Sequence, residues 1–142
     1  MIDTLLTFLL VGLLIPITLL HSYWLLGGQW ALDACLPIDN VVIQQRYTTT
    51  LLVILRIVTL VPVIVILCLL LATLLSLHPI LITYQLTIYL TIFLLCILRA
   101  VLGWIVFPFF IKKQGFIINN AKIFSPLFLL IGILFLCLYL LI

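Results

Sequence analysis

The sequence predicts an all-α fold, an integral membrane bundle of four transmembrane helices. Of its 142 residues, 68% are hydrophobic and 6% are charged. Soluble domains carry about 25% charged residues, so this chain cannot build the polar exterior of a water-soluble fold. Its apolar runs also approach the roughly 20 residues that a membrane-spanning helix needs. These observations together indicate that the bilayer is the solvent of this chain.

Four apolar runs divide the chain, and we treat residues 1–142 as one transmembrane domain. The first run lacks the basic start and small-residue cleavage site of a signal peptide, and further runs follow it. We therefore expect it to be retained as the first helix. The predicted spans are residues 5–26, 51–77, 80–102 and 124–142.

Glycine and proline mark the ends of these runs. Gly27–Gly28 should stop the first helix, since glycine often follows a last helical turn. His78–Pro79 predicts a short hairpin between helices two and three, because the residue before a proline avoids the helical region. Ser125–Pro126 reads as an N-cap followed by proline at the first helical position. Residues 103–110 contain glycine and proline, so we expect them to leave the helix and lie along the interface, before a basic connector at 111–122.

Basic residues gather on one side of the predicted topology. Arg46, Lys112, Lys113 and Lys122 all fall in the two connectors of that side, whereas the opposite side holds no Lys or Arg. Short loops with excess Lys and Arg face the cytoplasm. We therefore expect both termini on the non-cytoplasmic side of a multi-pass protein of the cytoplasmic (inner) membrane.

Two arginines lie inside predicted spans, where charge is costly and often marks a functional or paired position. Arg56 is 22 residues before His78 and Arg99 is 21 residues after it. At about 1.5 Å per residue, both reach the same level, roughly 32 Å from the hairpin. Each could extend to the lipid headgroups, both could share an anion site for a phosphate or carboxylate, or they could pair with Asp33 and Asp39 in the connector. The sequence leaves these three alternatives open.

An aromatic cluster closes the first span. His21, Tyr23 and Trp24 precede the glycine stop, and Trp30 follows it. A belt of interfacial aromatic residues explains most of this pattern. His21 lies inside the helix end, and we expect it to bond a neighbouring helix, since intramembrane polar groups usually find partners.

Several function classes are disfavoured by the residues that the chain offers. The basic residues form no patch typical of nucleic-acid binding. The second histidine, His78, lies on the opposite side of the membrane and the chain contains no Glu, so we expect no metal and no cofactor. His21 is the one visible candidate base, so we expect no enzyme activity and no catalytic residue.

The stretch His21–Pro37, HSYWLLGGQWALDACLP, resembles the opening motif of a bacterial family of small four-span proteins catalogued as domain of unknown function 3995. Arg99, Gly103 and Phe116 resemble later positions of the family, as does the Phe124–Leu127 start of the fourth span. The resemblance implies a bacterial membrane protein but no activity. This chain departs from the family in having Asn119, Asn120 and Lys122 where an Asp usually precedes the Ser-Pro, so any arginine pairing of that Asp must be rebuilt or absent.

We expect a protein that acts through intramembrane contacts with a protein partner, as an accessory subunit or immunity-type protein. The alternatives are a lipid-binding or small-molecule transport protein with an anionic-headgroup site at the cytoplasmic interface, or a membrane-embedded lipid-modifying enzyme. Membrane lipids are expected partners, and a homo-oligomer is possible. The candidate site at the inner interface comprises His21, Tyr23, Trp24, Trp30, Arg56, Arg99, Lys112 and Lys113, with Gly27, Gly28, Ser125 and Pro126 as structural positions.

Overall fold

The computed structural model describes residues 2–35, 49–74 and 79–141, and this part of the chain holds helices and turns without a strand. The predicted all-α class is therefore confirmed. The elements in chain order are α1 (Ile2–Leu25), α2 (Leu32–Cys35), α4 (Thr49–Leu74), α5 (Pro79–Val101), the π-helical turn η1 (Leu102–Val106), α6 (Phe107–Phe110), α7 (Gln114–Asn119), the π-helical turn η2 (Asn120–Phe124) and α8 (Ser125–Leu141).

Three of the described helical stretches are long and apolar enough to cross a membrane: Ile2–Leu25, Tyr84–Phe110 and Gln114–Leu141. The remaining long helix, α4, which is second in chain order, contributes the shorter apolar stretch Ile57–Thr73. Large apolar side chains are exposed along all four helices. Such a surface suits contact with lipid tails, because soluble monomers rarely expose extended apolar patches.

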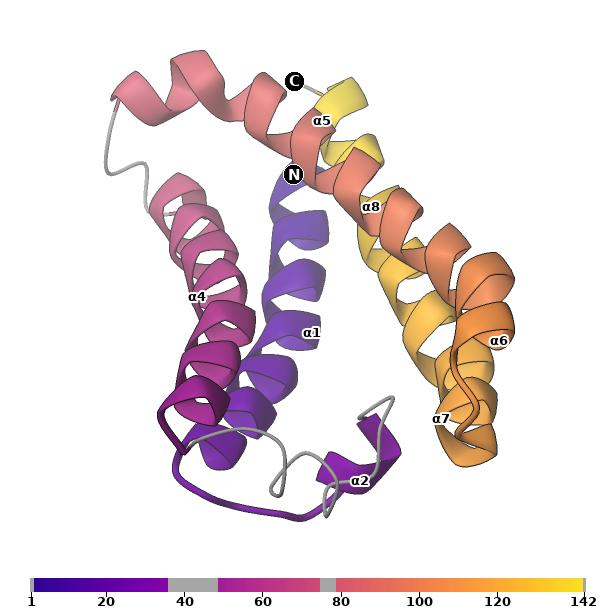
Figure 1. Cartoon of the computed structure of the whole chain (residues 1–142). Helices are drawn as coiled ribbons and strands as arrows, with labels where there is room; N and C mark the ends of the chain where they lie inside the picture. The colour runs from indigo at the N-terminus through magenta and orange to yellow at the C-terminus, as the bar shows by residue number, and fades with distance from the viewer. Residues whose placement is uncertain (1, 36–48, 75–78, 142) are drawn as a thin grey trace.

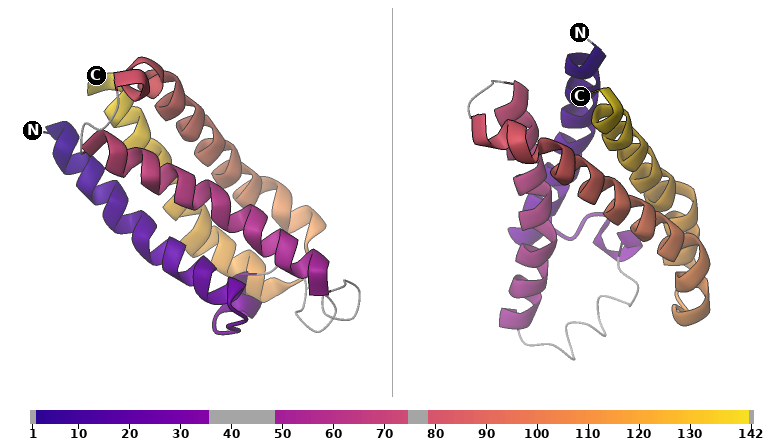
Figure 2. Two further views of the ribbon diagram at one scale, coloured as in Figure 1. Left: turned by 90° about the vertical axis from the view of Figure 1, so that its left-hand side faces the viewer. Right: turned by 90° about the horizontal axis from the view of Figure 1, so that it is seen from above.

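The helices are arranged as two pairs, α1 with α4 and α5 with α8 (Figures 1 and 2). The pairs meet near the two chain termini, which lie at the same end of the molecule (Figure 1). Their shared core there includes Leu10 and Leu14 of α1 and Phe135 and Leu138 of α8. The ring of Tyr89 from α5 packs at 5.6 Å from that of Phe135. This apolar core holds the two pairs together at one end.

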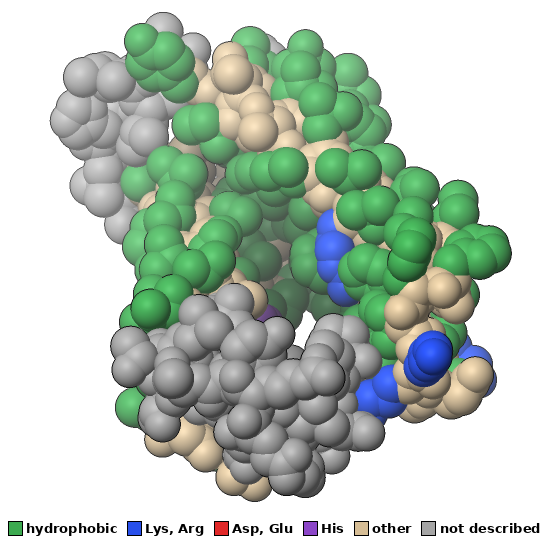
Figure 3. Space-filling model, viewed as in Figure 1, with side chains coloured by type: hydrophobic (Ala, Val, Ile, Leu, Met, Phe, Trp, Pro, Cys, Tyr) green, Lys and Arg blue, Asp and Glu red, His purple; other side chains and the backbone are tan. Residues whose placement is uncertain are grey.

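At the other end the two pairs diverge (Figure 1), and the space-filling view shows a hollow between them (Figure 3). The short helix α2 contacts α7 across this end. Blue Lys or Arg atoms lie on the α5/α8 side of the hollow, and purple His atoms lie deeper in it (Figure 3). Among the described residues, basic and His side chains thus border the open end of the molecule.

The predicted glycine stop of the first helix is confirmed. Gly27 has a φ of 97°, a left-handed conformation that glycine adopts without a side-chain penalty. Its N–H donates to the carbonyl of Trp24, and the N–H of Gly28 donates to the carbonyl of Tyr23. These two bonds form a Schellman motif, which satisfies carbonyls at the helix end. The chain therefore turns sharply after Leu25 and runs toward α2.

The expectation that residues 103–110 leave the helix is wrong. The helix of α5 continues through η1 into α6 and ends at Phe110. Within η1 the N–H of Phe107 donates to the carbonyl of Leu102, five residues back. Such a wide turn adds one residue to the helical repeat, and helices often change direction at these turns and at proline. The glycine and Pro108 thus alter the helix locally without ending it.

The structure also corrects the predicted connector at 111–122 and the predicted N-cap at Ser125. The helix begins at Gln114, within the predicted connector 111–122, and runs through η2 into α8. Ser125 therefore lies inside a continuous helix and does not cap it. Its N–H donates to the carbonyl of Asn120, again five residues back. The wide turn precedes Pro126 just as η1 precedes Pro108, which allows the helix to continue past a residue that usually interrupts it.

Candidate functional site

Arg99 lies in the last turn of α5, at the level where η1 and η2 face each other. Its Nη2 donates a hydrogen bond to Oδ1 of Asn120 at 2.9 Å. Asn120 starts η2, so this bond joins the third apolar helix to the fourth. An amide oxygen accepts from a guanidinium but carries no charge, so the bond positions Arg99 without neutralising it.

Two aromatic rings flank the guanidinium of Arg99. Its Cζ lies 4.9 Å from the ring centroid of Phe107 and 5.1 Å from that of Phe128. A cation over an aromatic face gains about 0.5–1 kcal/mol at exposed sites and about 2 kcal/mol when desolvated. A charge at the centre of a membrane helix costs about 2.5–3.5 kcal/mol on insertion scales. The two ring contacts thus offset much of the cost of holding this charge among apolar helices.

Asn120 links the two π-helical turns. Its Nδ2 donates to the carbonyl of Gly103 at 2.6 Å and to Oγ of Ser125 at 3.3 Å. Both Asn120 and Ser125 are completely buried. A second bond between the turns runs from Nε1 of Trp104 to the carbonyl of Ala121 at 3.0 Å. Hydrogen bonding within this buried cluster fixes where Asn120 presents its oxygen to Arg99.

The Nη1 atom of Arg99 is buried and has no hydrogen-bond partner within the described residues. It lies over Gly103, where an added Cβ would be 2.8 Å from it. A buried donor without an acceptor costs about 1–3 kcal/mol, and more when it is charged. The side chain as a whole keeps partial exposure. The described part of the chain thus offers this guanidinium one neutral acceptor, Asn120, and no carboxylate.

The other charged candidates are only partly described. Arg56 belongs to α4, but its side chain lies outside the described part, as do the side chain of Asp33 and the whole of Asp39. The predicted convergence of Arg56 and Arg99, and their pairing with aspartates, therefore remain predictions. Lys112 and Lys113 lie between α6 and α7, at the open end of the molecule, and Lys112 is exposed.

Within the described residues, His21 bonds its own helix and not a neighbouring one as expected. Its Nδ1 lies 2.8 Å from the carbonyl of Ile17, one turn earlier on α1. A histidine four residues after a carbonyl on the same helix face can reach it, because side chains point toward the helix N-terminus. The imidazole also packs against Trp24, with ring centroids 5.0 Å apart. These two contacts fix the orientation of the ring at the end of α1.

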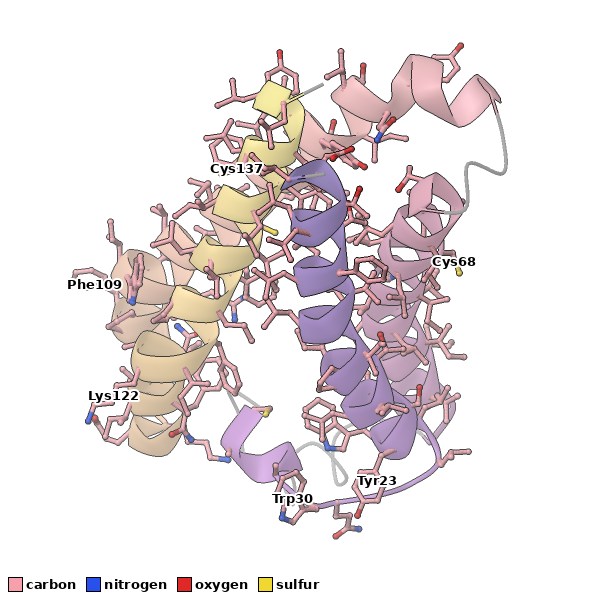
Figure 4. All side chains as sticks on the ribbon, turned by 180° about the vertical axis from the view of Figure 1, so that it is seen from behind. Tyr23, Trp30, Cys68, Phe109, Lys122 and Cys137 are labelled. Carbon is pink, nitrogen blue, oxygen red and sulfur yellow. The ribbon has the colours of Figure 1, made fainter. Side chains whose placement is uncertain are left out.

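The remaining aromatic candidates are arranged around the same helix end. Nε1 of Trp24 donates to the carbonyl of Trp30 at 2.9 Å, which ties the glycine turn to the helix. The ring of Tyr23 covers Gly28, where any Cβ would collide with it. Figure 4 shows Tyr23 and Trp30 at the lower end of the molecule, near α2, whereas Phe109 and Lys122 point outward from the α5/α8 pair.

The structure adds residues that the sequence analysis did not single out as a site. Phe107 and Phe128 received no role, and Asn120 appeared only where the chain departs from the family pattern. A signal for Asn120 was present, since a polar amide in an apolar span requires a partner. Two flanking phenylalanines could not be recognised in so apolar a sequence. Within the described residues, no group of His, Cys, Asp or Glu is arranged to hold a metal ion.

A family model described as protein of unknown function (DUF3995) matches residues 14–135. The chain belongs to this family. The matched range contains Arg99, Asn120 and the aromatic end of α1, and the match confirms the family that the sequence resembles. No curated protein and no solved structure matches the chain. Family membership therefore leaves the activity to be inferred from the geometry of the site.

Proposed function

We propose that this protein binds the anionic headgroup of a membrane lipid in the hollow between its helix pairs, through Arg99. The observation that carries the proposal is the environment of that guanidinium. One neutral amide, from Asn120, and two aromatic rings hold it, and Nη1 lacks an acceptor within the described residues. A phosphate or carboxylate oxygen at the exposed part of this side chain supplies the negative charge that its described neighbours lack.

The position of Arg99 favours a lipid as the source of that anion. The residue lies within the apolar stretch Tyr84–Phe110, which is long enough to cross a membrane, 11 residues before its end. Arg99 is thus roughly 16 Å from that end, so a lipid whose acyl chains lie along the apolar helices reaches it by placing its headgroup in the hollow between the helix pairs. Nη1 itself is covered, so an oxyanion reaches the guanidinium through the part of the side chain that stays exposed.

The membrane we propose is the bacterial cytoplasmic membrane, with the basic end of the molecule facing the cytoplasm. The asymmetry of Lys and Arg between the two sides of the chain supports this orientation. Reporter fusions at Lys122 and at the C-terminus test it. We expect cytoplasmic reporters to be active at Lys122 and inactive at the C-terminus, and the reverse pattern would reject the orientation.

The partner-protein role preferred from the sequence rests on short loops and on the lack of a recognised catalytic motif. We rank it second, because no cluster of described residues supports it as specifically as Arg99 supports the lipid site. A homo-oligomer is one form that such a partnership takes, and we propose no nucleic-acid partner. Pull-down from the native host in detergent tests this role, and recovery of the chain alone counts against it.

An enzymatic role comes last. The ring of Tyr23 lies against Gly28, whereas that of His21 lies against Trp24, so the two candidate acid–base residues contact different neighbours. General acid–base chemistry needs groups positioned on one substrate. If His21→Ala complements a deletion of the gene in the native host as fully as wild type does, this role is rejected.

The lipid proposal is tested by native mass spectrometry of protein purified in a neutral detergent and mixed with equal amounts of phosphatidylglycerol and phosphatidylcholine. A hydrogen bond to a charged group contributes about 1.5–3 kcal/mol, so Arg99→Gln should lower retention of the anionic lipid about 10- to 100-fold. Lys122→Gln is the matched control, because it removes one positive charge from an exposed outward position. Equal retention by folded Arg99→Gln and wild type contradicts the proposal.

A second arm separates the two sources of an anionic group. Inorganic phosphate is added to the lipid-loaded protein at a concentration well above that of the lipid. We expect the lipid to stay bound, because its acyl chains contribute burial that free phosphate lacks. Displacement by phosphate would show that the site takes a free anion and would reject the lipid assignment.

A further inference from the structure

The hollow contains a second polar group, whose hydrogen-bonding role is opposite to that of Arg99. Nδ1 of His21 lies 2.8 Å from the carbonyl of Ile17. A carbonyl oxygen only accepts, so Nδ1 carries the proton of the neutral ring. The other nitrogen, Nε2, is then an acceptor. The packing of the ring on Trp24 holds this tautomer in a fixed orientation.

The ends of α1 and α5 that carry these two residues border the same open end. Trp24 is bonded to Trp30, from which the chain continues into α2. The helix α2 contacts α7, and Asn120, which immediately follows α7, holds Arg99. His and Lys or Arg atoms are both visible inside the hollow in the space-filling view (Figure 3). A headgroup bound there meets a cationic donor on one wall and a neutral acceptor near the other.

The charge of the site limits the charge of its ligand. Among the described side chains of the polar cluster at Arg99, the arginine contributes the one positive charge, and Asn120 and Ser125 are neutral. Lys122 points away from the hollow (Figure 4). A ligand with two negative charges would leave one of them uncompensated in apolar surroundings, which is strongly unfavourable. A zwitterionic headgroup would instead leave its own ammonium group without a counter-charge among these described side chains.

We infer that the site selects a singly charged phosphodiester headgroup that carries a hydroxyl, of the glycerol type, with the phosphate on Arg99 and the hydroxyl donating to Nε2 of His21. This inference rests on the proposed function and adds the class of headgroup to it. Phosphate monoesters, with up to two negative charges, and ammonium headgroups fit less well. The acceptor on His21 is what distinguishes a hydroxylated headgroup from a bare phosphodiester.

The test compares phosphatidylglycerol with phosphatidylmethanol, a phosphodiester of the same charge that lacks a hydroxyl on its headgroup. With matched acyl chains, native mass spectrometry measures how much of each lipid the wild-type protein retains. One added hydrogen bond corresponds to about 0.5–1.5 kcal/mol, so we expect a preference for phosphatidylglycerol of about threefold to tenfold. Phosphatidic acid and phosphatidylethanolamine in the same mixture should bind more weakly than phosphatidylglycerol.

Variants of His21 identify the source of that preference. His21→Leu removes the acceptor, so it should bind the two phosphodiesters equally while retaining an anionic lipid. His21→Gln offers an amide oxygen and should keep part of the preference, which separates an acceptor role from a change in packing. Equal binding of the two phosphodiesters by wild type, an unchanged preference in His21→Leu, or stronger binding of phosphatidic acid would each overturn the inference.

The failure of this inference is distinguishable from that of the proposed function. Arg99→Gln should weaken the binding of both phosphodiester lipids to the same extent. If it does so and wild type binds both equally, the lipid site stands and the headgroup assignment is rejected. If folded Arg99→Gln retains both as well as wild type does, the site itself is rejected and the headgroup assignment with it.

Discussion

Nη2 of Arg99 lies 2.9 Å from Oδ1 of Asn120, although the two residues are 21 positions apart in the chain. The bond joins α5, which continues into η1, to the first residue of η2, which continues into α8. It therefore depends on the pairing of the third and fourth apolar helices. The resemblance noted in the sequence implies that an Asp is usual in this region, whereas the partner of the arginine is an amide. This bond leaves the positive charge of Arg99 without a compensating carboxylate among the described residues.

Replacing that amide by a carboxylate tests whether the free charge matters. Asn120→Asp places a negative charge beside Arg99, so the protein should lose retention of anionic lipid about 10-fold or more, as an internal anion competes with the headgroup. The carboxylate forms a stronger, charged hydrogen bond to Arg99 but cannot donate to the Gly103 carbonyl as the amide does. Because these two effects oppose each other, we expect a small change in thermal stability. Native mass spectrometry and thermal unfolding in detergent measure the two effects.

Asn119→Asp is the matched control for this change. It adds the same charge one position earlier, on a residue that is only partly buried. We expect its lipid retention to stay near that of wild type. If Asn120→Asp and Asn119→Asp lower retention equally, the effect is one of general charge and the neutral pairing has no special role.

Gly103 should tolerate no side chain. An added Cβ would lie 2.6 Å from Nδ2 of Asn120 and 2.8 Å from Nη1 of Arg99, and would collide with Oγ of Ser125. Overpacking of a buried site costs about 1–3 kcal/mol, so Gly103→Ala should lower the unfolding temperature in detergent and weaken lipid retention. Gly115→Ala is the control, because its Cβ would meet nothing within 4 Å. An unchanged unfolding temperature for Gly103→Ala would refute the tight packing of the two turns.

The sequence was sufficient for the helices but not for the bends between them. Long apolar runs allow few structures in a bilayer, since every backbone polar group must be bonded internally. The same constraint explains the error at Gly103–Phe110 and at Ser125–Pro126. Glycine and proline there indicated helix ends by rules derived from ordinary helices, whereas a wide turn absorbs the proline and keeps most backbone groups bonded.

The candidate site was predictable only in part, for a similar reason. Arg99 stood out because a charge is rare inside an apolar span. Phe107 and Phe128 did not, because phenylalanine is common in such spans and its contact with Arg99 depends on how two helices pair. The partner of His21 was misjudged because its own helix offers a carbonyl one turn back, which satisfies the ring without a neighbouring helix.

Cys35, at the end of α2, should react slowly with alkylating reagents. Burial raises the pKa of its thiol, because desolvation disfavours the thiolate. The thiolate is the reactive form, so its fraction at any pH below that pKa is smaller than in an ordinary thiol. A variant that retains Cys35 alone, with Cys68→Ser, Cys96→Ala and Cys137→Ala, should reach half-maximal alkylation by iodoacetamide at a higher pH than a peptide with the flanking sequence of Cys35. Coincident pH profiles would show that α2 does not shield this thiol.

The two glycines that end α1 should respond differently to alanine. Gly27 has a φ of 97°, and a side chain in that conformation costs about 1–2 kcal/mol whatever space surrounds it. At Gly28 the three atoms nearest the added Cβ all belong to the ring of Tyr23, which is 44% exposed and can rotate outward. We therefore expect Gly27→Ala to lower the unfolding temperature clearly, and Gly28→Ala to lower it little. Adding Tyr23→Ala should remove the small cost at Gly28 but leave that at Gly27 unchanged. Equal destabilisation by the two single variants would contradict the left-handed turn as the feature that stops the helix.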